Sequence, residues 1–292
     1  MEDTFWITNR FGEKLEALVR KPFVCQSAGQ SKPGGNNSFP AVIFVSGFGM
    51  DLHEYKNSFD EISKRFVDTG FLTLQFSFAG RGKSEGDYAK MTLERQADQI
   101  ADVIAWLQVR SDVQEEHIGI IAQSFGSPTT MTYLTGFGFK RPGLSGTKGP
   151  AFIKAVCFVG GVYFLAQRFQ TKAKQQRVAV RRDGITLFLD PFDNEIPIGP
   201  DFWKSIDAFN PKVAAAQVQL PALFIHGDQD HYITTVDATR IFDAIGSKEK
   251  QLKIISGGDH GIIDVPRSIR EELLLFLVDW FNQRLNSNSK YL

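Results

Sequence analysis

The sequence predicts an α/β protein in which a mostly parallel sheet is covered by helices on both faces. Apolar runs typical of buried strands alternate along most of the chain with amphipathic segments typical of helices. Strands that are joined through helices in this way pair in parallel and have both faces covered. The 292 residues are 42% hydrophobic and 23% charged, an ordinary globular composition with enough length for a sizeable core.

A β-hairpin is predicted first, at residues 3–22, with its turn at residues 9–14. Apolar runs then predict further strands at 41–47, 71–77, 117–122, 152–159, 220–227 and 251–257. Helices are predicted at 53–70, 92–109, 234–245 and 267–285, and another begins after Ser124. The clearest helix is 92–109, because its apolar residues recur on one stripe. A stretch rich in Gly, Ser, Asn and Pro at 27–38 is predicted to be a surface loop.

Residues 163–210 interrupt the alternation of strands and helices. The stretch is first basic, then acidic and rich in proline, and it holds no clean sheet strand. We interpret it as a small cap inserted over the carboxyl edge of the sheet, where open α/β sheets bind ligands. Its aromatic side chains either line an acyl or aromatic pocket or pack the cap onto the sheet: Phe164, Phe188, Phe192 and Trp203. The chain is thus interpreted as one domain, residues 1–292, with the cap within it.

The charge balance and the cysteines limit the classes of protein to which the chain can belong. Thirty-three basic residues balance thirty-three acidic ones, which argues against nucleic acid or an anionic membrane as a partner. No apolar run is long enough to span a bilayer, and the acidic N-terminus lacks the apolar core of a signal peptide. Cys25 and Cys157 suggest neither a disulfide framework nor a metal site. We therefore expect a soluble, cytoplasmic protein.

Two groups of basic residues could bind an anion, but a solvated position is the expectation for both. Arg81 and Lys83 lie in a Gly-rich turn. The run from Arg168 to Arg182 is predicted to be a solvated helix face that pairs with the acidic stretch 190–201.

Ser124 stands where an apolar strand passes directly into a helix, in the segment IGIIAQSFGSPTT. On a sharp turn of this kind a serine Oγ is lifted above the sheet edge, and the N–H of the next residue points to where an oxyanion would form. The crowded turn needs small neighbours, which Ala122 and Gly126 are, and Pro128 is tolerated in the first helical turn. These residues predict an activated nucleophile, against the alternative that Ser124 only caps the helix.

An acid and a histidine follow Ser124 at the ends of two later strands. Asp228 and Asp230 follow one predicted strand, and His260 follows the next. Because parallel strands end at the same edge of a sheet, these side chains can converge with Ser124. A serine with a histidine base and an orienting acid is the arrangement that nucleophilic acyl transfer needs.

Four motifs resemble those of the α/β-hydrolase superfamily of serine esterases and peptidases, and are most similar to its cinnamoyl- and feruloyl-esterase-like and serine-aminopeptidase-like members. They are the oxyanion loop SGFGMD (46–51), the turn FSFAGRGKSEG (76–86), the nucleophile elbow AQSFG (122–126), and the acid and histidine loops HGDQD (226–230) and GGDHG (257–261). The chain departs from the family pattern at Ser46, where the family has histidine, and at Ala122, where it has glycine. The resemblance runs from the first hairpin to the last helix, and it implies the α/β-hydrolase fold with an inserted cap.

The resemblance also implies a role for each of five residues. Ser124 would be the nucleophile, His260 the base and Asp230 the acid, because the family acid usually follows the glycine by three positions. The backbone N–H groups of Phe48 and Phe125 would form the oxyanion hole. Acyl transfer would then run through an acyl-enzyme that water hydrolyses, with no metal or organic cofactor. The implied reaction is hydrolysis of a carboxylic ester of short-to-medium acyl or aryl-acyl type, with a small-molecule ester or acyl substrate as the partner.

Other reactions would use the same triad. They are hydrolysis of thioesters, amides or peptides, and acyl transfer to an acceptor other than water, because fold and triad do not set the substrate. A C–C bond hydrolase is a further alternative. A non-catalytic ligand-binding protein on the same fold is an alternative of a different class.

Several polar residues near the motifs are expected to be structural. His226 ends a strand, and His53 is expected to open a helix. Asp228 could accept backbone N–H groups in its own turn. Asp259 and Asp264 flank the histidine loop and could compete with Asp230 as the acid, less well by position.

Overall fold

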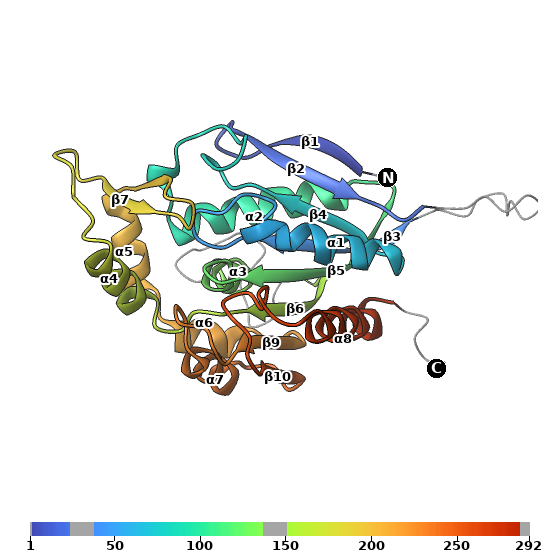
Figure 1. Ribbon diagram of the computed structural model, residues 1–292. Helices are drawn as coiled ribbons and strands as arrows, with labels where there is room; N and C mark the ends of the chain where they lie inside the picture. Colours follow the sequence, from blue (N-terminus) through green and yellow to red (C-terminus); the bar gives the residue numbers. More distant parts are fainter. Residues whose placement is uncertain (1, 24–37, 137–150, 287–292) are drawn as a thin grey trace, which may run out of the picture.

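The computed structural model describes residues 2–23, 38–136 and 151–286. Within these ranges, eight strands form one sheet in the order β1-β2-β4-β3-β5-β6-β9-β10 (Figure 1). Their bounds are β1 Glu2–Thr8, β2 Lys14–Arg20, β3 Phe39–Val45, β4 Leu72–Phe76, β5 Val113–Gln123, β6 Ile153–Val159, β9 Ala222–Gly227 and β10 Lys250–Ile255. The pairs β1–β2 and β2–β4 are antiparallel, and every pair from β4 onward in this order is parallel. The predicted hairpin and the mostly parallel sheet are therefore confirmed.

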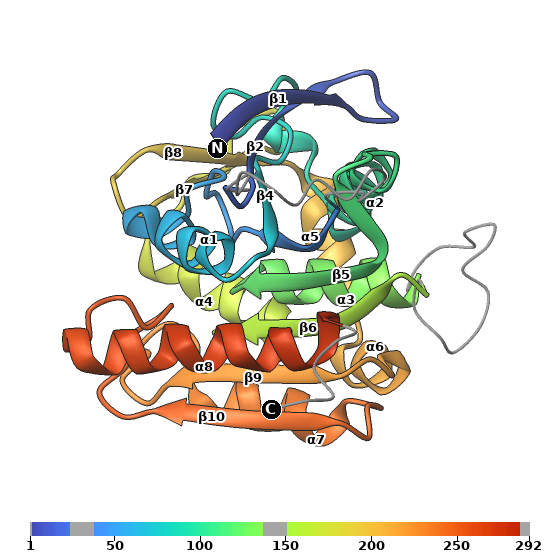
Figure 2. The ribbon, with the colours of Figure 1, turned by 90° about the vertical axis from the view of Figure 1, so that its right-hand side faces the viewer.

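Helices cover both faces of this sheet (Figure 2). Their bounds are α1 Ser58–Asp68, α2 Leu93–Gln108, α3 Gly126–Thr135, α4 Leu165–Gln175, α5 Pro200–Ala208, α6 Pro211–Gln217, α7 Thr235–Ala244 and α8 Arg267–Leu285, with short 3₁₀ helices η1 Tyr55–Asn57 and η2 Tyr88–Lys90. Strand β3 serves the cores on both faces, because successive side chains of a strand point to opposite sides. Val42 and Phe44 join the core under α1 and α8, whereas Ile43 and Val45 join the core under α2 and α3.

Helix α2 forms for the reasons that the sequence predicts. Its apolar stripe is buried along its whole length, at Leu93, Ala97, Ile100, Ile104 and Leu107. Thr92 caps the helix, because its side-chain oxygen accepts the backbone N–H of Arg95 at 3.0 Å. The helix predicted at 53–70 differs at its start, since the regular α1 begins only at Ser58.

The cap segment, residues 163–210, lies between β6 and β9 in the chain. It holds α4, α5 and an antiparallel pair of short strands, β7 Thr186–Leu189 and β8 Glu195–Ile198, which form a sheet of their own. In Figure 1 it lies on the side of the sheet toward which the arrows of β5 and β6 point. The backbone N–H of Gly199 donates to the carbonyl of Ala89 at 2.9 Å, which ties the segment to η2.

The two cysteines and the predicted surface loop fall in different parts of the structure. Cys157 is buried in β6, as its apolar run predicts. Cys25 and residues 27–37 of the predicted loop lie outside the described residues.

Candidate active site

Ser124 sits between the end of β5 and the start of α3, in a conformation that serine rarely adopts. Its φ is 51°, in the left-handed region that disfavours side chains other than glycine. Its backbone N–H donates to the carbonyl of Val159 at 2.8 Å, which fixes the turn against the end of β6. The small residue predicted two positions later is required, since a Cβ on Gly126 would lie 2.5 Å from the carbonyl oxygen of Val45.

The alternative role of Ser124 as a helix cap is not seen. Helix α3 takes Phe125 as its N-cap residue, and no side chain forms a cap hydrogen bond there. The hydroxyl of Ser124 is therefore not used to close the helix.

His260 and Asp230 lie side by side, as the order of motifs predicts. Nδ1 of His260 is 2.7 Å from Oδ2 of Asp230, while Oδ1 of Asp230 accepts the backbone N–H groups of Tyr232 and Ile233 at 2.9 Å each. The Asp230 side chain is only 1% exposed. Burial acts to raise the pKa of Asp230, but hydrogen bonds from His226 and His260, the charge of His260 and the Ile233 N–H together hold it below its ordinary value. Such an acid stays ionised and can orient the imidazole.

The end of β6 joins the serine turn to the histidine loop. Ser124 is bonded to Val159, and the next residue, Gly160, has a φ of 58°. A Cβ on Gly160 would lie 3.1 Å from Cε1 of His260 and 3.8 Å from Oδ2 of Asp230. The three predicted triad positions thus meet around one short backbone segment, at the carboxyl ends of the parallel strands.

The other histidines and acids near the motifs have partners of their own. Nε2 of His226 is 2.8 Å from the Ile233 carbonyl and 3.4 Å from Oδ2 of Asp230, so the buried imidazole braces the acid loop. Asp228 accepts the Gly257 N–H at 2.8 Å.

Outside that loop, the remaining alternatives also form local contacts. His53 pairs with Asp60 at 2.8 Å. Asp259 accepts the backbone N–H of Ile263 at 2.6 Å. Asp264 forms an ion pair with Lys56 at 2.6 Å.

Neither of the two predicted oxyanion donors has an acceptor in the part of the chain that the structure describes. In the oxyanion loop, the Gly47 N–H donates to Oε2 of Glu54 at 2.7 Å and the Gly49 N–H donates to the Tyr88 hydroxyl at 2.9 Å. The N–H between them, that of Phe48, has no acceptor within the described parts of the chain. The same holds for the N–H of Phe125, which follows Ser124. Free N–H groups next to a serine are what an oxyanion needs.

Glu54 is a residue of the site that sequence reasoning missed. A Cβ on Gly47 would lie 3.3 Å from Cβ of Ser124 and 3.5 Å from both carboxyl oxygens of Glu54, so the carboxyl is close to the serine. Burial raises the pKa of Glu54 to about 7, although it accepts the backbone N–H groups of Gly47 and Tyr55. The only sequence signal was an acid at the start of a predicted helix, which is typical of an ordinary first turn.

Aromatic rings from the oxyanion loop, the serine turn and the cap segment pack together beside the site. The ring of Phe48 has its centroid 4.8–6.1 Å from those of Phe125, Phe169, Phe188 and Phe202. These contacts hold the cap segment against the oxyanion loop.

The four aromatic residues singled out in the cap segment are used differently. Phe188 is fully buried in the ring cluster, and Trp203 packs on it with a centroid distance of 5.6–6.0 Å to Phe202 and Phe188. Phe164 stacks against Tyr163 at 5.0 Å. Phe192 is 60% exposed, with its ring centroid 5.7 Å from that of Tyr55, so it lies outside the packed core.

The expectation of solvated basic residues holds only in part. Lys83 is 80% exposed in its side chain, but that of Arg81 is only 18% exposed and lies 3.9 Å from Asp190. The prediction was wrong for Arg81 because the cap segment, which supplies Asp190, covers the turn. Burial also lowers the pKa of Lys172, against the charge of Asp190, and its Nζ lies 5.4 Å from the centroid of the Phe48 ring.

Arg168 departs from the predicted pairing in another way. It forms an ion pair with Asp237 of α7, outside the acidic stretch expected to receive it. The basic run is thus tied to the main domain as well as to the cap segment.

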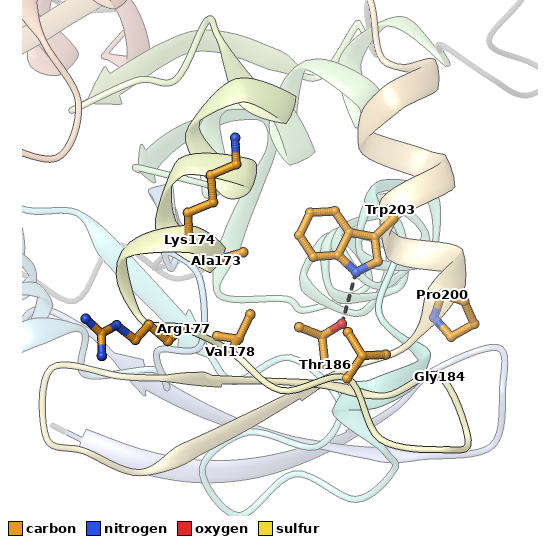
Figure 3. Close-up of a pocket in the computed structure, with 9 residues that line it drawn as sticks. Ala173, Lys174, Arg177, Val178, Gly184, Thr186, Pro200 and Trp203 are labelled. Carbon is orange, nitrogen blue, oxygen red and sulfur yellow. Dashed lines mark hydrogen bonds between the residues drawn. The ribbon is translucent and has the colours of Figure 1, made fainter.

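A cavity of about 650 Å³ lies in the cap segment, between α4, β7 and α5 (Figure 3). Trp203 forms one wall, and its Nε1 donates to Oγ1 of Thr186 at 3.3 Å. Lys174 and Arg177 of the α4 end lie at the opposite side, with their charged groups directed away from the tryptophan. None of the residues that line the cavity belongs to the predicted triad or to the oxyanion loop.

The described residues show neither a metal-binding cluster nor a helix able to cross a membrane. Among the described residues, no group of three or more His, Cys, Asp and Glu side chains is arranged to hold a metal ion. None of the helices in the described ranges combines the length and apolarity that crossing a bilayer requires.

Two family models match separate parts of the chain. The model of the X-Pro dipeptidyl-peptidases (S15 family) matches residues 27–136, and that of the serine aminopeptidases (S33) matches residues 204–264. Between them they include the oxyanion loop, the serine turn and the acid and histidine loops. An uncharacterized 31.7 kDa protein in the traX-finO intergenic region of Escherichia coli is 22% identical over 239 residues, which cover 75% of this chain and 82% of that protein.

Solved structures resemble the chain over nearly its whole length. The esterase domain of a Rhodothermus marinus protein has a TM-score of 0.69 at 16% identity, covering 98% of this chain and 100% of that one. The α/β hydrolase GrgF from Penicillium sp. sh18 has a TM-score of 0.71 at 18% identity, covering 98% and 99%. Est1E from Butyrivibrio proteoclasticus, solved with ferulic acid bound, has a TM-score of 0.69 at 17% identity, covering 94% and 98%. At these identities the likeness confirms the predicted fold.

Proposed function

We propose that this α/β-hydrolase is a serine hydrolase that cleaves carboxylic esters, with Ser124 as nucleophile, His260 as base and Asp230 as the orienting acid. The fold and the two family models support the coarser statement that the chain is a hydrolase. One observation carries the finer proposal. Ser124 is held at a φ of 51°, and its hydroxyl forms no hydrogen bond that caps the helix. Such strain is typical of a nucleophile turn, because the turn leaves the hydroxyl free above the sheet edge.

The reaction would run in two halves. Oγ of Ser124 attacks the ester carbonyl carbon, its proton passes to His260, and the carbonyl oxygen becomes an oxyanion between the N–H groups of Phe48 and Phe125. The C–O bond then breaks as His260 gives the proton to the leaving alcohol, which leaves an acyl-enzyme. Water attacks that ester with its proton again taken by His260, and the acid is released as Ser124 regains the proton. Asp230 holds Nδ1 of the imidazole at 2.7 Å throughout.

The surroundings of Phe48 favour an acyl or aryl-acyl group as the part that binds there. Phe48 is only half-buried above the packed rings of the cap segment, so its exposed face can contact either an acyl chain or a planar ring. Est1E, a structure of the same fold, is described with ferulic acid bound. We therefore keep esters of aromatic acids among the proposed substrates, beside those of short-to-medium aliphatic acids.

The test compares wild type, Ser124→Ala and His260→Ala on p-nitrophenyl esters of increasing chain length and on methyl ferulate. Ser111→Ala, at an exposed position just before the start of β5 and so at the opposite end of that strand from Ser124, is the matched control. We expect turnover by wild type and Ser111→Ala, a loss of roughly 10⁴-fold or more in kcat for the other two, and covalent labelling of wild type by a fluorophosphonate. Undiminished turnover by Ser124→Ala would refute the nucleophile. Absence of both turnover and labelling would leave a ligand-binding protein on a hydrolase fold.

Amide or peptide hydrolysis is the second candidate, because both matching family models carry peptidase names. The same triad can cleave an amide, provided that the leaving amine is protonated by His260. Aminoacyl p-nitroanilides and matched p-nitrophenyl esters of the same acid separate the two. A higher kcat/KM for the anilide than for the ester would make amide hydrolysis the first candidate. Thioester cleavage is tested in the same way with acyl thioesters, whose released thiol is detected with dithiobis(nitrobenzoate).

A further inference from the structure

The carboxyl of Glu54 is held in place by a strained segment of backbone. Glu54 has φ 60° and ψ 176°, a combination that is essentially restricted to glycine, and Lys56 and Asn57 have φ of 52° and 56°. Strain of this kind persists where the surroundings over-determine the conformation, and it clusters at functional sites. Here the strained turn delivers a single carboxyl to the Gly47 N–H, beside Ser124.

The side chain closes one of two clamps on the oxyanion loop. On one side of Phe48, the carboxyl of Glu54 accepts the Gly47 N–H at 2.7 Å. On the other side, the hydroxyl of Tyr88 accepts the Gly49 N–H at 2.9 Å. With both neighbours satisfied, the Phe48 N–H has no acceptor among the described residues and is available to an oxyanion. The two clamps differ in chemistry, because one is a carboxyl and the other a phenol.

Titratable groups face Glu54 from three elements. Asp51 of the oxyanion loop opposes ionisation of Glu54, and His260 of the histidine loop favours it. Tyr88 of η2 also faces it, and burial raises the pKa of Tyr88 to about 12, so the phenol stays neutral. The charged groups that the structure sets against Glu54 are thus those of His260 and Asp51.

We propose that Glu54 is a positioning residue whose ionised carboxylate holds the oxyanion loop in its donor conformation and faces the imidazolium formed on His260. This inference rests on the proposed serine hydrolase function and adds a second ionisation to it. Because burial brings the pKa of Glu54 to about 7, the carboxyl takes up a solvent proton as the pH falls below neutrality. Protonation removes both the charge that faces His260 and one acceptor for the backbone N–H groups. Activity then falls with two deprotonations rather than one.

The test is the slope of log kcat/KM against pH between pH 5 and 9, measured with p-nitrophenyl butyrate. A histidine base alone gives a slope of about one on the acid side, and two required ionisations give a slope approaching about two. We expect about two for wild type and about one for Glu54→Gln, whose amide oxygen keeps the Gly47 contact without titrating. At pH 8 we expect kcat of this variant to be lowered roughly tenfold, less than the 10²–10³ of a lost oxyanion donor.

Three variants separate this role from simple support of the loop. Tyr88→Phe removes the other clamp but no group that titrates near pH 7, so kcat should fall several-fold at every pH with the slope of about two retained. Glu54→Asp keeps a titrating carboxyl, so it should retain the slope of about two with a lower kcat. Glu115→Gln, at an exposed position on the opposite end of β5 from Ser124, should match wild type in both respects.

The outcomes keep the two proposals apart. If Glu54→Gln retains the wild-type slope and kcat, the positioning role is refuted while the serine hydrolase stands. If wild type neither turns over esters nor reacts with a fluorophosphonate, the hydrolase itself is refuted, and this inference with it. Should Glu54→Gln fail to fold, ¹³C NMR of wild type labelled at the glutamate carboxyl carbons decides: a buried carboxyl that titrates near pH 7 is expected, and its absence refutes the role.

Discussion

Asp230 and Glu54 are two buried carboxyls that approach His260 from different loops. Asp230 has one oxygen on two backbone N–H groups and the other 2.7 Å from the imidazole, whereas Glu54 receives only backbone N–H groups, from Gly47 and Tyr55. Burial favours the neutral form of each, yet the donors around Asp230 bring its pKa below the ordinary value while that of Glu54 rises to about 7. Burial therefore dominates at Glu54, whereas at Asp230 the hydrogen bonds and the charge of His260 outweigh it and keep that carboxyl ionised.

This difference assigns the two carboxyls different tasks. A carboxylate that stays ionised can orient the base permanently, which is the role we propose for Asp230, whose Oδ2 lies 2.7 Å from Nδ1 of His260. A carboxyl that titrates near neutrality can change the site with pH. The pair follows a general pattern, in which neighbouring acids have pKa values driven apart by their environments.

Replacing Asp230 is expected to have the largest effect. Asp230→Asn keeps the shape of the side chain but removes the charged acceptor of the His260 N–H, so the imidazole loses its tautomer and orientation. We expect kcat on a p-nitrophenyl ester to fall by roughly 10³–10⁴. A loss of less than tenfold would show that the two carboxyls do not differ in role, and Glu54→Gln measured in parallel gives the smaller reference value.

Replacing Glu54 by glutamine should raise the stability of the protein above neutral pH, whereas the same replacement lowers kcat. The folded-state pKa of Glu54 is raised from 4.5 to about 7, so the folded protein binds more protons than the unfolded chain between these values. Ionisation thus destabilises the fold as the pH rises, by roughly 3 kcal/mol once the pH is above 7. In urea titrations, the free energy of unfolding of Glu54→Gln minus that of wild type should therefore increase by up to about 3 kcal/mol between pH 5 and pH 8. An unchanged difference between the two pH values would contradict the raised pKa, and Glu115→Gln serves as control.

Replacing His226 removes one of the donors around Asp230 and so makes the surroundings of this carboxyl more like those of Glu54. The buried imidazole lies 2.8 Å from the Ile233 carbonyl and 3.4 Å from the Asp230 carboxylate, so His226→Phe removes a donor from the acid loop. We expect kcat to fall roughly tenfold and the free energy of unfolding to drop by about 1–3 kcal/mol, because the carbonyl is left unsatisfied. His226→Gln can place an amide N–H at the same position and should lose less on both counts. Equal losses for the two variants would mean that ring packing, not the donor, is responsible.

The smallest effect is expected at Asp228, two residues from Asp230. It accepts the Gly257 N–H at 2.8 Å and the side-chain amide of Gln229 at 3.1 Å. Asp228→Asn retains an acceptor oxygen, so kcat should change by less than about threefold. A loss comparable to that of Asp230→Asn would overturn the choice between these two acids.

The sequence predicted the frame of the site well because the frame depends on the apolar runs that recur along most of the chain. Apolar runs marked the parallel strands, and parallel strands bring their carboxyl ends to one edge, which placed Ser124, Asp230 and His260 together. Glu54 could not be found in this way. Its role depends on three residues of left-handed backbone and on one hydrogen bond to Gly47, neither of which leaves a periodic signal.

The cap segment was the other part that composition alone described poorly. Its charge pattern predicted a solvated Lys172, and the Gly-rich turn predicted a solvated Arg81, yet both side chains are covered where the cap segment packs. The hairpin of β7 and β8 also lies in a proline-rich stretch where a strand is not expected. Tertiary contact overrode local composition at both places.

The parallel arrangement of the strands has a consequence for the order in which the protein folds. Each parallel pair joins segments that are separated in the chain by at least one helix, and the bond from Ser124 to Val159 spans such a gap. Contacts between distant segments form late, because the loop between them must first be closed. Helical signal in far-ultraviolet circular dichroism should therefore return early after dilution from urea, and reactivity of Ser124 toward a fluorophosphonate should return last. With the function proposed here, Ser124 then reports the completion of folding, and a nascent or damaged chain with a loosely joined sheet should carry no reactive serine.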